Sequence, residues 1–353
     1  MLPKLKVKKK IPSFDIGGVS VKPGTQQTVH LPVSRLYTHT PVDLTVHVVH
    51  GSHPGPCLFV SAAIHGDELN GVEICRRLLE CRPYQSLQGT LLVIPVVNVL
   101  GFLHKSRYFP DRRDLNRSFP GLSKGSLAAQ TADLFMREIV ARASYGIDLH
   151  SGTQQRFNLP QTRGKSGSEV VEAMARAFNA PVHLNTELLD GSLRQAAFNV
   201  EVPVLLFEGG EGMSLDEVTI RVGLKGILGV MYHLKMLAKG GVKSQNIYSK
   251  WCSASSSSWV RAPESGMIQL LKRVGTFVHE GEILGRIYNP LGKEVTEVRV
   301  PREGVIIGHS NHPLVHQGDA LFHIAFIPES SAIQERVQER FVGLHEGLDD
   351  EFL

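Results

Sequence analysis

The middle of the chain alternates short apolar runs with stretches whose apolar residues recur at helical spacing. The apolar runs have the length of single strands and cover residues 57–64, 90–97, 145–149, 181–184 and 204–207. The helical stretches between and after them cover residues 69–81, 126–143, 167–179 and 214–238. Strands that are apolar throughout are buried on both faces, and helices are what usually covers such faces. The alternation therefore predicts an α/β fold in which helices flank a sheet.

A different organisation begins after the last helical stretch. Residues 253–258 read Ser-Ala-Ser-Ser-Ser-Ser, a composition typical of a flexible linker. Beyond this segment, residues 262–268 match residues 300–306, and residues 278–284 match residues 315–321. Short β-rich repeats bury a core only when they pack together, so the two copies are expected to form one small barrel-like sandwich.

Predicted domain boundaries follow these changes of pattern. They are a lead-in at residues 1–40, a main domain at 41–240, a serine-rich linker at 241–258, a small β domain at 259–328 and an acidic tail at 329–353. Near the start of the main domain, strict alternation of apolar and polar residues predicts a half-buried edge strand or hairpin. A chain of 353 residues is long for one core and suits two domains.

Composition argues against several classes of partner. The net charge of +4 is too small to indicate binding to nucleic acid, and no apolar run reaches the length of a membrane span. The basic residues 1–10 precede no apolar segment, so they do not form a secretory signal. The cysteines, Cys57, Cys75, Cys81 and Cys252, show neither a metal-binding nor a disulfide spacing, which favours the reducing cytoplasm. A homo-oligomer is compatible with this composition.

A histidine and a glutamate follow the first apolar run directly. His65 and Glu68 stand three residues apart, so one turn of backbone can aim an imidazole nitrogen and a carboxylate oxygen at the same cation. His150 ends another strand-like run, with Asp148 two residues before it. A catalytic zinc ion takes three protein ligands and keeps a fourth position for water. The combination predicts a metal centre, although a lone His-x-x-Glu is more often a solvated pair on a loop.

Two further features carry residue types suited to hydrolysis. Glu208 follows a buried strand and precedes two glycines, where a carboxylate can act as a base and then as an acid. Glu211 is its rival in sequence, and a simple capping role is the alternative for both. Residues 107–117 contain four arginines, which are suited to gripping a carboxylate or stabilising an oxyanion. The alternative for that segment is a basic surface loop.

Together these motifs resemble the succinylglutamate desuccinylase/aspartoacylase family, a branch of the zinc carboxypeptidase superfamily. The resemblance rests on His65-Gly-Asp-Glu68, Arg113-Asp-Leu-Asn-Arg117, Asp148-Leu-His150 and Glu208-Gly-Gly210, and it covers residues 40–325. It implies a mixed sheet flanked by helices and one zinc ion per chain. The ligands it implies are His65, Glu68 and His150, with Glu208 as the general base and acid.

The resemblance also implies how a substrate would be held. Asn116 and Arg117 would bind the carboxylate of an amino acid, and an arginine before the Asp-Leu-Asn-Arg motif would stabilise the oxyanion. Arg107 is the first choice for that arginine and Arg113 the second, because the segment between Arg107 and Asp114 is longer than in the two named enzymes. Arg156 is predicted to line the substrate pocket.

The implied activity is zinc-dependent hydrolysis of the amide bond of N-acylated amino acids or similar small N-acyl amines, with Glu208 assisting the attack of metal-bound water. Asp67 replaces the asparagine usual in the two named enzymes, which leaves the acyl group and the amine open. A zinc carboxypeptidase acting on peptides is the alternative. A non-catalytic binding or carrier protein is a third, since the C-terminal repeat resembles a biotinyl/lipoyl-type barrel. Lys293 lies near the carrier position, but its neighbours differ from a carrier setting, and we interpret it as an ordinary hairpin lysine.

Overall fold

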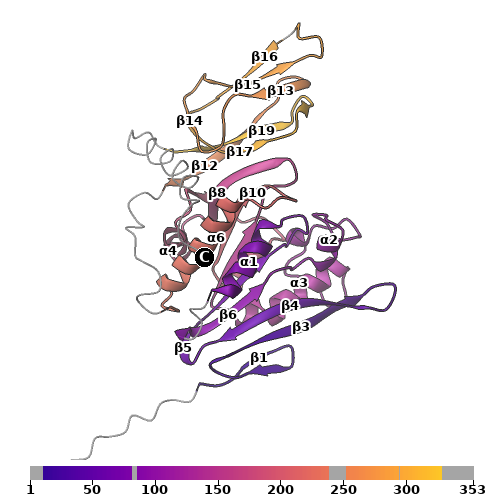
Figure 1. Cartoon of the computed structure of the whole chain (residues 1–353), viewed down its shortest axis with the longest axis vertical. Coiled ribbons are helices and arrows are strands. Elements are labelled where there is room, and N and C mark those ends of the chain that lie inside the picture. Colours follow the sequence, from indigo (N-terminus) through magenta and orange to yellow (C-terminus); the bar gives the residue numbers. More distant parts are fainter. Residues whose placement is uncertain (1–10, 82–85, 238–251, 294, 328–353) are drawn as a thin grey trace, which may run out of the picture.

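The computed structural model describes residues 11–81, 86–237, 252–293 and 295–327. A large sheet forms the centre of the molecule, with helices beside it and a smaller β region at one end (Figure 1). The basic N-terminal residues, the first part of the expected linker and the acidic tail at 329–353 lie outside the described residues. No helix in the described part of the chain is both long and apolar enough to cross a membrane.

The main sheet is mixed, and its centre is parallel. Its hydrogen-bonded order is β12 (Ser256–Arg261), β19 (Ala320–Phe326), β17 (Gly304–Ser310), β8 (Arg156–Lys165), β10 (Val204–Gly210), β7 (Tyr145–His150), β5 (His53–Ala62), β6 (Gln88–Ile94), β4 (Pro41–His50) and β3 (Thr25–Arg35). Strands β10, β7, β5 and β6 run parallel to one another, whereas β8 and β4 join them antiparallel. Two short strands, β9 (Val182–Thr186) and β11 (Ser253–Ala254), extend the sheet from β8. The mixed sheet implied by the family is confirmed.

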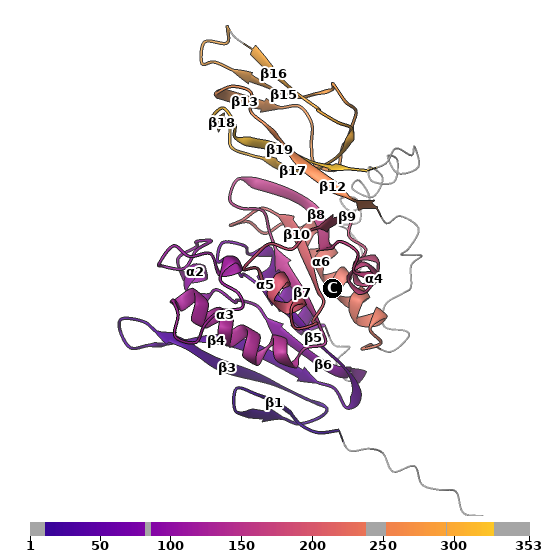
Figure 2. The ribbon, with the colours of Figure 1, turned by 180° about the vertical axis from the view of Figure 1, so that it is seen from behind.

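Helices cover both faces of this sheet. One apolar core contains residues of α1 (Asn70–Glu80), α4 (Glu169–Phe178) and α6 (Glu217–His233), which lie on the face seen in Figure 1. A second core contains residues of α2 (Val99–Leu103), α3 (Leu127–Glu138) and α5 (Leu193–Phe198), on the face seen in Figure 2. The side chains of Ser126, Ser168 and Ser192 accept hydrogen bonds from backbone N–H groups and so cap the starts of α3, α4 and α5.

The predicted alternation of strands and helices is confirmed. The apolar runs coincide with β5, β6, β7, β9 and β10, and the helical stretches with α1, α3, α4 and α6, except that the second stretch ends in a short 3-10 helix, η3 (Val140–Arg142). Strand β8 was not predicted, because polar residues and Pro160 interrupt its pattern. The lead-in also differs from expectation: β1 (Phe14–Ile16) pairs with β2 (Val19–Val21), and β3 forms with β4 the hairpin of the main sheet.

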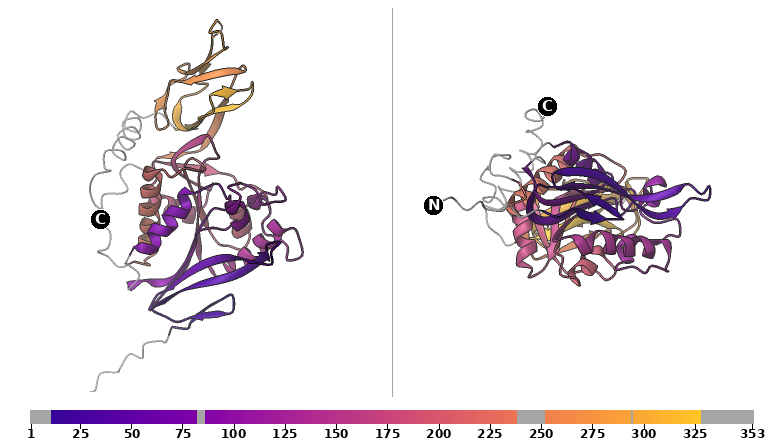
Figure 3. Two further views of the ribbon diagram at one scale, coloured as in Figure 1. Left: turned by 45° about the vertical axis from the view of Figure 1, so that its right-hand side comes forward. Right: turned by 90° about the horizontal axis from the view of Figure 1, so that it is seen from below.

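The C-terminal repeat folds into two antiparallel layers around one apolar core. One layer contains β13 (Gly266–Leu270), β15 (Ile283–Tyr288), β16 (Val295–Arg299) and β18 (Leu314–Val315), and β14 (Phe277–Val278) pairs with β17 in the other. We call residues 256–327 the C-terminal β region. Figure 3 shows it at one end of the main sheet. Strands β12, β19 and β17 of this region belong to the main sheet, in which β17 pairs with β8 through backbone hydrogen bonds.

The expected linker is wrong for its last six residues. Ser253–Ala254 forms β11, and Ser256, Ser257 and Ser258 belong to β12, which pairs antiparallel with β19. Serine side chains bury little apolar area, so a serine-rich composition suggests a linker. A strand is also held by backbone hydrogen bonds, and β19 supplies the hydrogen-bond partners of β12. Lys293 lies between β15 and β16 and is exposed, as expected for a lysine in a hairpin.

Candidate metal centre

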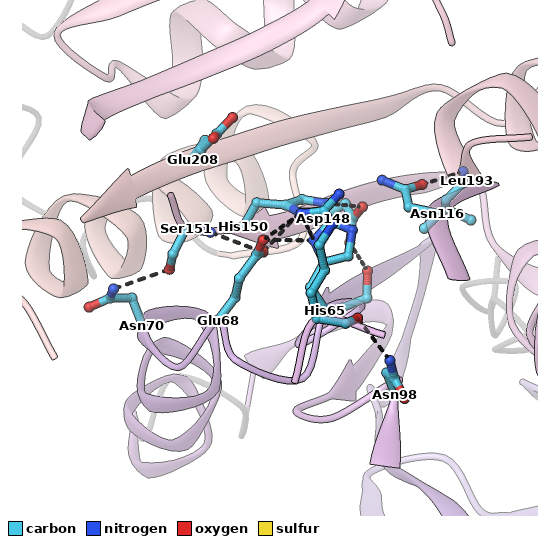
Figure 4. Close-up of polar contacts among 12 residues, drawn as sticks. His65, Glu68, Asn70, Asn98, Asn116, Asp148, His150, Ser151, Leu193 and Glu208 are labelled. Atoms are coloured by element: carbon cyan, nitrogen blue, oxygen red, sulfur yellow. Dashed lines mark hydrogen bonds and ion pairs between the residues drawn. The ribbon is translucent and has the colours of Figure 1, made fainter. Parts of the chain in front are cut away.

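Three buried side chains meet at the carboxyl ends of two neighbouring parallel strands. Glu68 Oε1 lies 2.6 Å from His65 Nδ1, and Glu68 Oε2 lies 3.0 Å from His150 Nδ1. One ligand atom from each residue lies within 4.8 Å of the others, and all three residues are buried. Figure 4 shows the side chains converging above the loop between β5 and α1. The structure thus brings together the three ligands expected from the sequence.

The loop that carries His65 and Glu68 is shaped by close packing. It follows β5 and reaches the start of α1, and Ala63 in it has a positive φ of 47°. A β-carbon at Gly66 would lie 2.0 Å from the carbonyl carbon of Gly101 in α2, so only glycine allows this approach. His150 ends β7, which pairs with β5, and it therefore arrives beside the loop from the adjacent strand.

Residues around the three ligands fix their orientation. His150 Nε2 lies 2.8 Å from Asp148 Oδ2, so its other ring nitrogen faces Glu68. The hydroxyl of Ser61 donates to Asp148 Oδ1 at 2.8 Å. The backbone N–H of Ser151 donates to Glu68 Oε2 at 3.1 Å. Carboxylates that hold the second nitrogen of a histidine are a regular feature of metal sites. Asp148 holds His150 in this way.

The charges in this cluster favour a cation. Burial alone would raise the pKa of Glu68, but the imidazoles of His65 and His150 outweigh burial and hold it well below its usual range. Burial alone would lower the pKa of His150, but Asp148 and Glu68 raise it to about 10. An ionised carboxylate between two imidazoles attracts positive charge, which either protons or a metal ion can supply. Two imidazole nitrogens and one carboxylate oxygen form a donor set that fits zinc.

Arg107 reaches the metal centre, whereas Arg113 does not. Arg107 Nη1 lies 3.3 Å from His65 Nδ1, and its Nη2 donates to Asp114 Oδ2 at 2.9 Å. Asp114 Oδ1 in turn lies 3.3 Å from His65 Nε2. Arg113 is exposed and pairs with Asp111 at 3.2 Å. Of the two arginines considered for the oxyanion, only Arg107 is placed beside the ligands.

The expected carboxylate-binding pair is divided between the site and the surface. Asn116 lies in η2 (Leu115–Arg117), and its Oδ1 accepts a hydrogen bond from the backbone N–H of Leu193 at 2.9 Å. Its amide nitrogen points back toward the ligands in Figure 4. The side chain of Arg117 is exposed, and its Nη1 donates to the carbonyl oxygen of Asn116 at 2.6 Å.

Glu208 and Glu211 are held by different partners. Glu208 stands opposite His150 in the parallel pairing of β10 with β7, so both side chains leave the sheet on the same face. Its carboxylate contacts Asn158 and Arg163 of β8. Glu211 Oε1 accepts a hydrogen bond from the backbone N–H of Gln155 at 2.6 Å. That contact gives Glu211 a structural role, and of the two glutamates Glu208 is the one that stands opposite His150 in the sheet.

Comparison with known proteins identifies the family. The sequence model of the succinylglutamate desuccinylase/aspartoacylase catalytic domain matches residues 54–234, just over half of the chain. The chain belongs to this family. Its relatives are amide hydrolases acting on non-peptide carbon–nitrogen bonds, and this chain is an enzyme of that class.

Individual members of the succinylglutamate desuccinylase/aspartoacylase family are similar over most of the chain. N-alpha-acetyl-L-2,4-diaminobutyric acid deacetylase of Halomonas elongata is 28% identical over 293 residues, which cover 78% of this chain and 84% of the relative. The product-bound structure of the ectoine utilization protein EutE (DoeB) of Ruegeria pomeroyi superposes with a TM-score of 0.76 at 24% identity, covering 85% of this chain and 94% of that one. A family structure from Rhodobacter sphaeroides gives 0.75 at 23% identity, covering 85% and 96%. These structures share the fold of this desuccinylase/aspartoacylase-family chain.

Two arginines of this family member were not found from the sequence. Arg163 contacts Glu208, and Arg194 in α5 is only 8% exposed, with its Nη1 donating to Thr186 Oγ1 at 3.2 Å. Burial, and next the charge of Arg163, lower the pKa of Arg194 to about 10. No motif distinguishes such a buried arginine from one on an exposed helix face.

Arg156, which is predicted to line the pocket, lies at the start of β8 and contacts the C-terminal β region. Its side chain is exposed, and its guanidinium carbon lies 5.3 Å from the ring centroid of Trp259 in β12. Among the described residues, Arg156 makes no polar contact with His65, Glu68 or His150. The sequence could not anticipate this, because Trp259 is about a hundred residues away along the chain and meets Arg156 only through the fold.

Proposed function

We propose that this enzyme hydrolyses the amide bond of small N-acyl amino acids at a zinc ion held by His65, Glu68 and His150. The observation that carries the proposal is the buried cluster of these three side chains in a chain of a deacylase family. The relative from Halomonas acts on an α-N-acetylated amino acid, which supports an N-acyl amino acid as the substrate class.

The side chains around the cluster have distinct parts in the proposed reaction. A bound zinc ion would supply a Lewis acid for the acyl carbonyl and for the attacking water. Glu208 takes a proton from that water and delivers it to the leaving nitrogen. Arg107, whose Nη1 lies 3.3 Å from His65 Nδ1, would stabilise the negative charge that develops on the carbonyl oxygen. Asn116 and Arg117 receive the carboxylate of the amino acid, for which the free amide nitrogen of Asn116 is suited.

A substrate panel with a matched pair of variants tests this proposal. Zinc-loaded protein is assayed against N-acetyl-2,4-diaminobutyrate, N-succinylglutamate, an N-acyl aspartate and a dipeptide, and we expect release of the acyl group from at least one acyl amino acid. Glu208→Gln should retain zinc and lose activity by about 100- to 10,000-fold, the usual contribution of a general base. Glu211→Gln is the control, because the glutamine amide can form hydrogen bonds with the same partners, Gln155 and Asn311, and it should keep activity. Cleavage of the dipeptide alone, or full activity of Glu208→Gln, would contradict the proposal.

A further inference from the structure

The carboxylate of Glu208 is held at both oxygens by residues of one strand. Asn158 Nδ2 donates to Oε1 at 2.6 Å, and Arg163 Nη2 lies 2.8 Å from Oε2. Both partners belong to β8, which pairs antiparallel with β10. The pairing shifts register between Glu208 and Gly210, where the ladder is irregular. Two charged or polar partners on separate oxygens restrict rotation of the Glu208 side chain to a single orientation.

The C-terminal β region contacts Asn158 through β17, which pairs with β8 on the edge away from β10. In the pairing of β17 with β8, Gly308 stands opposite Asn158, and His309 stands opposite Phe157 with their rings stacked at 6.3 Å. A β-carbon at residue 308 would lie 2.5 Å from Asn158 Oδ1. Glycine at this position therefore leaves the space that the amide of Asn158 occupies while its Nδ2 binds Glu208.

The segment that follows Glu208 also forms a hydrogen bond with the C-terminal β region. Asn311 lies just beyond β17, and its Nδ2 donates to Glu211 Oε2 at 2.7 Å. The backbone N–H of Asn311 donates to the carbonyl oxygen of Gln155, just before β8, at 2.7 Å. Asn311 thus contacts both the loop after Glu208 and the residue that precedes β8, the strand that carries Asn158 and Arg163.

Arg163 also has the C-terminal β region beside it. Burial, and next the positive charge of Arg163, lower the pKa of His323 in β19 to about 3. His323 is therefore neutral at ordinary pH, and the other positive charge near the guanidinium is Arg194, whose pKa burial and next the charge of Arg163 lower. This leaves Glu208 as the charged partner that Arg163 contacts directly within the described residues.

We propose that Asn158 and Arg163 are positioning residues for Glu208, and that the C-terminal β region holds them in place through Gly308 and Asn311. This inference rests on the proposed function, since it presumes that Glu208 is the base. Its consequence is a role for the C-terminal β region in catalysis without any contact with the metal ligands. A displacement of about 1 Å in a reacting group can cost on the order of 100-fold in rate, so the loss of either partner should be visible in kcat.

The test compares Asn158→Ala, Arg163→Met and Gly308→Ala with wild type and with Gly318→Ala. Residue 318 has a φ of 90° and open space around it, so alanine there strains the same β region without touching Asn158. We expect the first three variants to retain zinc and a similar KM while kcat falls by about 10- to 100-fold. Gly318→Ala should keep kcat even if its melting temperature drops. Arg163→Lys should recover part of the kcat lost in Arg163→Met, because it restores a positive charge within reach of Oε2.

Unchanged kcat in Asn158→Ala and Arg163→Met would overturn the proposal, as would a rise in KM alone, which would make Arg163 a substrate contact. Inactivity of the wild type on every acyl amino acid would instead refute the proposed function. In that case, crystal structures of Arg163→Met and Gly308→Ala test whether these residues position Glu208, independently of any activity. A Glu208 side chain that has turned away supports it, and one in its original orientation overturns it.

Discussion

The metal centre and the surroundings of Glu208 lie side by side on the main sheet, but they are built in different ways. The three ligands come from the ends of parallel strands β5 and β7, and their contacts join one loop to the adjacent strand. Glu208 comes from β10, but its partners come from antiparallel β8, which is held in turn by β17. In the proposed function, metal binding would therefore depend on the parallel centre of the main sheet, whereas the position of the base would depend on the junction with the C-terminal β region. The two properties should be separable by mutation.

The largest effect is expected at the metal centre itself. His150→Ala removes one ligand and leaves Glu68 with a single imidazole, so metal affinity should fall by more than about 100-fold, since even residues that only orient ligands cost about 10- to 100-fold. Zinc measured by mass spectrometry after dialysis and activity in the deacylase assay should both approach zero. His50→Ala is the matched control, because His50 is buried in β4 and bonded to Thr90. Full zinc occupancy in His150→Ala would contradict the assignment of this ligand.

A smaller loss should separate the two candidate oxyanion arginines. Arg107→Met should lower kcat by about 100- to 1,000-fold, the usual cost of removing one donor to an oxyanion. Arg113→Met should behave as wild type, because this side chain is exposed and contacts only Asp111 among the described residues. Steady-state kinetics on zinc-loaded protein measure both. The reverse ranking would show that the segment rearranges when substrate binds.

The same difference between local and distant contacts explains what the sequence could predict. His65 and Glu68 stand within one turn of backbone, and apolar runs mark β5 and β7. The sequence pattern was therefore enough to predict these strands and the candidate ligands. The partners of Glu208 could not be found in this way. Strand β8 is polar and contains Pro160, and Asn158 gains its position only when Gly308, 150 residues later in the chain, pairs with it. The prediction of a linker at residues 253–258 is wrong for the same reason, since the backbone partners of these residues lie in β9 and β19.

The charge of the metal centre should also appear in the stability of metal-free protein. The pKa of His150 is raised from 6.5 to about 10, and that of His65 is raised as well. Because these histidines bind protons more tightly in the folded state than in the unfolded state, their protonation stabilises the folded protein. The full stabilisation is present below pH 6.5, and it is lost as pH increases toward 10. Melting temperatures of chelator-treated protein should therefore fall across that range. Zinc-loaded protein should show a flatter profile there, because the metal replaces the protons. A metal-free profile that is level or rising would contradict the ionised Glu68 between two imidazoles.

The smallest effect is expected at Arg156, and it distinguishes an arginine that lies near the junction from one that acts on the base. Arg156→Ala removes a cation over Trp259, an interaction worth about 0.5–1 kcal/mol at exposed sites. We expect a slight loss of unfolding free energy in chemical denaturation, with kcat and KM unchanged. Arg163 stands seven residues later on the same strand, but it contacts Glu208. Its replacement should therefore lower kcat, which Arg156→Ala should not do. If Arg156→Ala raised KM, the guanidinium would have to leave Trp259 for the substrate, and the pocket would extend to the junction with the C-terminal β region.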